Sequence, residues 1–101
     1  MLDLNYKWME LAIKEAKIGE GNFEVPVGAV LVDLSNNELI SKSSNKIISK
    51  TNPLLHAEME VIREGVKFLK NRYLNNTAIY TTLEPCFMCA SAISEARISR
   101  L

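Results

Sequence analysis

The single histidine and the two cysteines constrain the fold of this chain more than any other residues, because all three fit one metal site. The histidine stands in His56-Ala57-Glu58, and the cysteines stand in Pro85-Cys86-Phe87-Met88-Cys89. The sequence predicts that a helix begins at each motif, since proline suits a first helical turn. Cysteines at positions i and i+3 share one face of a helix, so both sulfurs can reach the same point. The fold is therefore expected to bring the starts of two helices together.

This donor set favours a catalytic zinc ion over a structural one. Two thiolates and one imidazole leave the fourth position of a tetrahedral ion open, whereas structural zinc sites usually close with four protein ligands. The start of a helix is expected to lower the pKa of a thiol and to present it as a thiolate. Zinc lowers the pKa of a bound water towards about 7. Glu58 is predicted to move protons between that water and a substrate.

Each motif also has a simpler interpretation when it stands alone. A C-x-x-C pair in a small α/β protein is also typical of a thioredoxin-like redox site. An H-A-E at a helix start also fits a capping histidine followed by an exposed glutamate. The combination in this order, H-x-E followed by P-C-x-x-C, is the signature of the zinc-dependent nucleobase deaminases. We therefore interpret it as a site for hydrolytic removal of an amino group from a nucleobase.

The hydrophobic pattern predicts an α/β domain with the element order α-β-β-α-β-α. The predicted helices are 5–18, 56–70 and 85–96, and the predicted strands are 27–34, 38–42 and 78–83. Residues 43–53 are predicted to be a polar loop, and 98–101 to begin a further strand. This order implies a mixed sheet covered by helices.

Two of the predicted helices show an apolar face with helical spacing. The first is expected to bury Met9, Ala12, Ile13 and Ala16. The second is expected to bury Met59, Ile62, Val66 and Leu69.

Composition bounds the class of protein and its partners. With 101 residues, of which 48% are hydrophobic, the chain is predicted to be one globular domain over 1–101. Its 12 basic and 12 acidic residues give no net charge, so composition does not favour a sequence-independent nucleic-acid binder. The first residues include acids and no long apolar run, so we expect no export signal, no membrane span and a cytoplasmic location. In that compartment the cysteines are not expected to form a structural disulfide.

Several segments resemble the cytidine and deoxycytidylate deaminase superfamily, over nearly the whole chain. The HAE and PCxxC motifs carry the resemblance to the superfamily. The other matching segments are EVPVGAVLV (24–32), Asn45, TLEPCFMCASAI (82–93) and ARI (96–98). The EVPVGA stretch makes the sequence most similar to the bacterial tRNA adenosine deaminases, which convert adenosine to inosine at the anticodon wobble position.

The resemblance implies a three-layer α/β/α fold, a zinc cofactor and a set of site residues. The residues that it assigns to zinc binding and proton transfer are His56, Cys86, Cys89 and Glu58. The backbone N–H of Ala57 would meet the flipped base, Asn45 would hydrogen-bond its edge, and Val27 would line the pocket. Without the resemblance, Asn45 is a polar loop residue and Val27 a core strand residue. The resemblance also implies a homodimer that draws contacts to the tRNA anticodon stem-loop from both subunits.

The sequence departs from the family pattern in two places. Many relatives have Asp-Pro-Thr before the HAE motif, whereas this chain has Asn52-Pro53-Leu54-Leu55. The family continues past the end of this chain with more strands and a C-terminal helix, so we expect a C-terminally truncated form of the fold. Two other functions stay open. One is a deaminase of a free base or nucleoside such as guanine or cytosine, and the other is a non-catalytic zinc-binding remnant or partner subunit.

Overall fold

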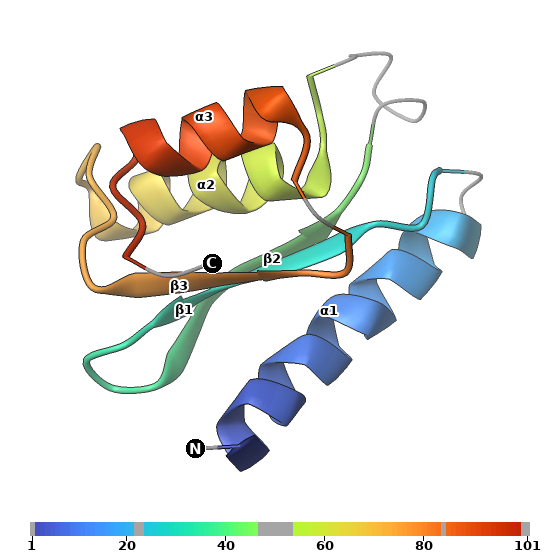
Figure 1. The fold of residues 1–101 in the computed structure, drawn as a ribbon, viewed down its shortest axis with the longest axis horizontal. Helices are drawn as coiled ribbons and strands as arrows, with labels where there is room; N and C mark the ends of the chain where they lie inside the picture. The colour runs from blue at the N-terminus through green and yellow to red at the C-terminus, as the bar shows by residue number, and fades with distance from the viewer. Residues whose placement is uncertain (1, 22–23, 47–53, 84, 100–101) are drawn as a thin grey trace.

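The computed structural model describes residues 2–21, 24–46, 54–83 and 85–99, and it has the element order that the sequence predicts. The helices are α1 (Leu2–Gly21), α2 (Ala57–Leu69) and α3 (Phe87–Glu95), and the strands are β1 (Gly28–Asp33), β2 (Glu38–Ser44) and β3 (Thr77–Thr81). Figure 1 shows the strands as a central layer, with α1 on one face and α2 and α3 on the other. The predicted three-layer arrangement is confirmed. Within the described ranges, every helix is too short or too polar to cross a membrane.

The sheet has the strand order β2-β1-β3, and both pairings are antiparallel. Asn37, with a φ of 57°, closes the turn between β1 and β2 in a left-handed conformation that asparagine tolerates. Ser43 and Ser44 extend β2 by pairing with Ala29 and Gly28. The prediction of a loop from residue 43 is therefore wrong for these two serines, whose polarity hid their place in the sheet.

The mixed sheet that the element order implied is not formed by these three strands. Ile98 and Ser99 are not in a strand, although the Ser99 N–H donates to the Thr77 carbonyl at 3.1 Å. The Leu74 N–H donates to the Ala96 carbonyl at 2.6 Å, so 96–99 lies beside 74–77 with the same chain direction. That direction is the one a parallel pairing needs. Residues 100–101 of the predicted further strand lie outside the described residues.

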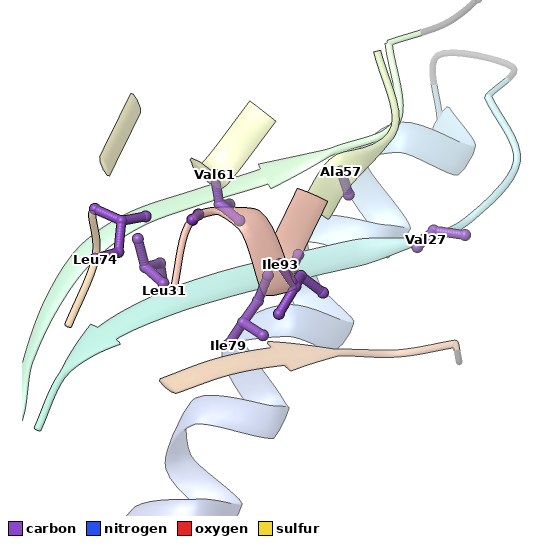
Figure 2. Close-up of a cluster of buried hydrophobic side chains, with 9 residues drawn as sticks. Val27, Leu31, Ala57, Val61, Leu74, Ile79 and Ile93 are labelled. Atoms are coloured by element: carbon purple, nitrogen blue, oxygen red, sulfur yellow. The ribbon is translucent and has the colours of Figure 1, made fainter. Parts of the chain in front are cut away.

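Strand β1 separates two apolar clusters, because successive side chains of a strand point to opposite faces. Val30 and Val32 pack with Trp8 of α1, whereas Leu31 joins the cluster beneath α2 and α3. Figure 2 shows labelled members of this second cluster: Val27, Leu31, Ala57, Val61, Leu74, Ile79 and Ile93. Because both faces of the sheet are buried, the positions of α2 and α3 on it are fixed by packing.

The predicted buried face of the first helix is partly right. Ala12 and Ala16 are buried, but Ile13 is 43% exposed and Trp8 is buried in addition. The buried residues at positions 12 and 16 are alanines because α1 approaches β1 closely and leaves no room for larger side chains. A β-carbon on Gly28 would overlap the carbonyl oxygen of Ala12, so α1 lies almost directly on the start of β1.

The second helix turns its smaller residues to the sheet. Ala57, Val61 and Gly65 are spaced four apart and buried, and a β-carbon on Gly65 would overlap Leu31. The predicted face lies at the edge of this contact, where Leu69 is 36% exposed. The other three residues of that face are half-buried: Met59, Ile62 and Val66. The prediction gave weight to large apolar residues, whereas a close contact with a sheet selects small ones.

Candidate metal centre

His56 is positioned by the start of α2. It occupies the N-cap position with an extended backbone (φ −69°, ψ 152°), and its side chain does not cap the helix. Its ring Nδ1 lies 3.7 Å from Cys86 Sγ and 3.5 Å from Cys89 Sγ. The imidazole therefore faces the start of α3 and not its own helix.

The two cysteines are positioned by the start of α3. Cys86 is the N-cap residue (φ −69°, ψ 172°), and Cys89 lies in the first turn, three residues later. Figure 1 shows that helices α2 and α3 begin at the same end of their layer. The two sulfurs therefore lie within 3.7 Å of the imidazole Nδ1. Cys86 is exposed and Cys89 is fully buried. The group thus has one side open to solvent and one side set in the core.

The three donor atoms fit a zinc ion. All of them lie within 4.8 Å of one another. A tetrahedral ion with a Zn–S distance of about 2.3 Å and a Zn–N distance of about 2.0 Å separates nitrogen from sulfur by roughly 3.5 Å. The observed separations from His56 Nδ1 are 3.5 and 3.7 Å. The fold therefore brings the predicted ligand set together, and three protein donors leave a fourth position for water or substrate.

Burial raises the pKa of the Cys89 thiol to about 12. The charge of Glu58 and a hydrogen bond with Cys86 add to this effect. The expected lowering of the thiol pKa by the helix start is wrong for Cys89, because the cost of burying a thiolate outweighs the helix dipole. A bound cation reverses this balance, since a coordinating thiol is deprotonated. Cys89 must therefore lose its proton when a metal binds.

Glu58 is buried beside the ligands, with 3% of its surface exposed. It lies in the first turn of α2, and its influence on the pKa of Cys89 shows that the carboxylate is near that sulfur. Among the buried side-chain oxygens and nitrogens of the described residues, Glu58 Oε1 is the one without a hydrogen-bond partner. An unpaired buried carboxylate oxygen is unfavourable for folding. It suits a group that has to accept and return a proton.

The three predicted base contacts lie together at the start of α2. Asn45 Oδ1 accepts a hydrogen bond from the Ala57 N–H at 2.7 Å, and the Asn45 N–H donates to the Val27 carbonyl at 3.2 Å. All three residues are buried, and the Val27 side chain packs in the cluster of Figure 2. The Ala57 N–H is thus already bonded to Asn45.

Sequence reasoning missed three exposed apolar side chains that flank the ligands. Leu54 precedes His56 by two residues and is 55% exposed, whereas Leu83 and Phe87, on either side of Cys86, are 55% and 89% exposed. The available signal was a large apolar residue within three positions of a ligand in the sequence. Residues 52–53, part of the departure from the family pattern, lie outside the described residues.

Comparisons with known proteins show the family to which the chain belongs. The family described as the cytidine and deoxycytidylate deaminase zinc-binding region matches residues 3–101. The tRNA-specific adenosine deaminase of Buchnera aphidicola (subsp. Baizongia pistaciae) is 52% identical over 101 residues, which are 100% of this chain and 61% of that protein. The protein of the same name from Haemophilus influenzae is 43% identical over 99 residues, 98% of this chain and 57% of its own length. The chain thus spans about three fifths of the length of these curated relatives.

Two solved structures share the fold. One, from studies of A-to-I editing by tRNA:A34 deaminases at the wobble position of transfer RNA, has a TM-score of 0.88 and 43% identity, covering 92% of this chain and 66% of that one. The other is a guanine deaminase from Bacillus subtilis, with a TM-score of 0.88 and 31% identity, covering 94% of this chain and 60% of that one. Since the TM-scores are equal, the fold alone does not separate the two activities.

Proposed function

We propose that this chain, which belongs to the cytidine and deoxycytidylate deaminase family, hydrolyses an amino group from a nucleobase at a zinc ion held by His56, Cys86 and Cys89. The observation that carries the proposal is the unpaired, buried Oε1 of Glu58 beside these ligands. A buried carboxylate oxygen without a partner is a feature that packing does not explain. Proton transfer in a zinc site does explain it.

The contribution of the chain itself to the reaction is proton movement by Glu58. When bound, zinc supplies a Lewis acid that lowers the pKa of a water towards about 7. The Glu58 carboxylate takes a proton from the attacking water and delivers it to a ring nitrogen, while a C–O bond forms at the carbon that bears the amino group. A second transfer through the same carboxylate moves the remaining proton of the added oxygen to the amino group, and ammonia leaves as the C–N bond breaks and the C=O bond forms. Burial of Glu58 keeps bulk water from competing for the proton.

The proposed substrate is adenosine at the wobble position of a tRNA anticodon stem-loop. Support comes from relatives named tRNA-specific adenosine deaminases, which are 39–52% identical to this chain. A base has to leave the stack before its ring can be attacked, so selectivity depends on contacts to its edge. With Oδ1 of Asn45 bonded to Ala57, the amide NH₂ group of Asn45 is available as a donor to a ring nitrogen. Val27, buried next to them, would form part of the pocket wall.

A second candidate is deamination of a free base such as guanine. The specific observation in its favour is the guanine deaminase structure, whose TM-score of 0.88 equals that of the tRNA deaminase structure. The higher sequence identity, 43% against 31%, favours the tRNA substrate.

The exposed apolar side chains near the metal centre support two proposed partners, a second subunit and the tRNA. Leu54, Leu83 and Phe87 lie within three positions of a ligand in the sequence, where a nucleobase or a second subunit would cover them. Exposed apolar groups beside a binding site commonly mark an interaction surface. We assign this surface to a homodimer in which both subunits bind the stem-loop. The proposed location is the cytoplasm, where tRNA is the substrate.

The experiment is a substrate panel with zinc-loaded protein. The panel contains an anticodon stem-loop with adenosine at the wobble position, guanine, cytosine and cytidine, and inosine or ammonia is measured. We expect inosine from the stem-loop only. Glu58→Gln should lose activity by a factor of about 10² to 10⁴. The matched control is Glu64→Gln, on the exposed side of the same helix, and it should retain activity.

Each alternative predicts a different result in this panel. Ammonia from guanine alone would replace the proposed substrate with a free base. A zinc-loaded, folded protein that acts on no member of the panel would favour the non-catalytic zinc-binding role. Activity that survives in Glu58→Gln would exclude the proposed proton transfer.

A further inference from the structure

The side chain at the N-cap position of α2 does not cap the helix. An N-cap side chain normally accepts a hydrogen bond from a backbone N–H in the first turn. His56 holds that position without making such a bond, because its ring faces the sulfurs of Cys86 and Cys89. An imidazole turned to the metal centre leaves the first turn of α2 in need of another acceptor.

Asn45, from outside the helix, supplies an acceptor. Its Oδ1 lies 2.7 Å from the backbone nitrogen of Ala57, the first residue of α2. Ala57 is 0% exposed, so water cannot readily replace this bond. Asn45 follows the last residue of β2, and its own N–H donates to the carbonyl of Val27, just before β1. One asparagine therefore joins the ends of two strands to the start of the helix that follows His56.

We propose that Asn45 is a positioning residue for the metal centre. By capping α2 through the Ala57 N–H, Asn45 fixes His56 and Glu58 relative to the sheet. This inference rests on the zinc site of the proposed function but not on the deamination reaction. It gives Asn45 a function in the substrate-free protein, separate from any contact with a base. Residues that orient metal ligands from one step away typically change metal affinity 10- to 100-fold when they are replaced.

The test compares zinc affinity and hydrogen exchange in three variants of the full chain. Asn45→Ala removes the acceptor, whereas Asn45→Asp keeps an oxygen whose negative charge also suits a helix start. Ser41→Ala is the matched control. The Ser41 hydroxyl donates to the Val61 carbonyl at 2.8 Å, so this variant also removes a buried bond between β2 and α2, but one turn further along the helix. Zinc affinity is measured by competition with a chromophoric chelator, and exchange of the Ala57 amide by NMR.

Asn45→Ala should bind zinc about tenfold more weakly or worse, and its Ala57 amide should exchange faster. Asn45→Asp and Ser41→Ala should stay close to the wild type in zinc affinity, even where Ser41→Ala unfolds at a lower temperature. Wild-type affinity in Asn45→Ala, or equal losses in Asn45→Ala and Ser41→Ala, would overturn the proposal.

If Asn45→Ala does not fold, hydrogen exchange of the Ala57 amide in the zinc-loaded wild type tests the proposal instead. A protected Ala57 amide supports the proposed cap, and an unprotected one overturns it. Failure of the deaminase assay would not change either readout, so it would count against the proposed function alone.

Discussion

Gly28 and Ala12 are in direct backbone contact. A β-carbon on Gly28 would overlap the carbonyl oxygen of Ala12 and lie 2.6 Å from the backbone nitrogen of Ala16. Both partners belong to the backbone of α1, so neither can swing aside as a side chain would. The contact sets the distance between α1 and the start of β1.

Gly28→Ala should therefore lower the free energy of unfolding by about 1–3 kcal/mol, the usual range for overpacking in a core. Urea unfolding with and without the substitution measures it. The matched control is Gly21→Ala at the end of α1, where nothing lies within 4 Å of the added carbon. This control should leave stability unchanged or raise it by about 0.4–1 kcal/mol. Equal midpoints for Gly28→Ala and the wild type would show that the helix can move away without loss.

The pKa of Cys89 predicts a pH-dependent metal affinity. With a pKa of about 12, the thiol of the metal-free protein holds its proton at neutral pH, and the metal must displace it. Protons compete less as the pH rises, so the apparent zinc affinity should increase about tenfold per pH unit for this one proton. Chelator competition at several pH values around neutrality measures the slope. An affinity that does not vary with pH would mean that no thiol proton is released.

The same shift has a consequence for the metal-free protein. The pKa of Cys89 in the folded state lies above the 9.0 of an unperturbed thiol, so the folded chain binds this proton more tightly than the unfolded chain. The resulting stabilisation is complete below pH 9.0 and is lost as the pH rises through about 12. Chelator-treated protein should unfold more easily above pH 9, as followed by denaturant titration. Cys89→Ser should show a smaller loss, because serine has no proton to release there.

Glu58→Gln should retain zinc and should not lower the unfolding temperature. The substitution replaces a buried carboxyl group, whose Oε1 has no hydrogen-bond partner, with an amide of similar size, so the packing around it is kept. Elemental analysis and thermal unfolding of the zinc-loaded variant check both statements. Loss of the metal in Glu58→Gln would make Glu58 a ligand instead of a proton carrier.

Phe87→Ser should weaken partner binding without affecting the fold. Phe87 is 89% exposed beside Cys86, so its replacement should change stability by less than about 0.5 kcal/mol. We expect a raised KM for the stem-loop or a weaker dimer, measured by kinetics and by sedimentation. Phe68→Ser is the control, because Phe68 is 68% exposed near the other end of α2. Equal effects of both substitutions would remove Phe87 from the proposed surface.

The ligand set could be predicted because its information is local. Spacing placed Cys86 and Cys89 on one helix face, and the combined signature of H-x-E followed by P-C-x-x-C joined His56 to them. The element order followed for the same reason, since it depends on periodicity within short windows. The burial of Trp8 and the pairing of Ser44 in β2 could not be predicted from such local patterns. Which side of a helix touches the sheet, and which serines pair in a strand, depends on partners distant in the sequence.

Two features of the centre could not be predicted, because they arise from the environment of a residue and not from its neighbours in the chain. The bond from Ala57 to Asn45 joins residues 12 positions apart across a segment without regular pattern. The pKa of Cys89 depends on how deeply α3 sets that sulfur in the core, where burial outweighs the helix dipole. Neither the hydrogen bond nor the pKa can be predicted from composition and spacing.

The donors of the metal centre come from the start of α2, which precedes β3 in the chain, and the start of α3, which follows it. Cys86 lies 30 positions after His56. A metal held there acts as a cross-link that closes a loop containing α2 and β3. Such a link removes conformational freedom mainly from the unfolded chain, and more of it for longer loops. Loading the ion should therefore make the release of α3 from the sheet less favourable, much as a disulfide would, but reversibly and under the control of metal supply.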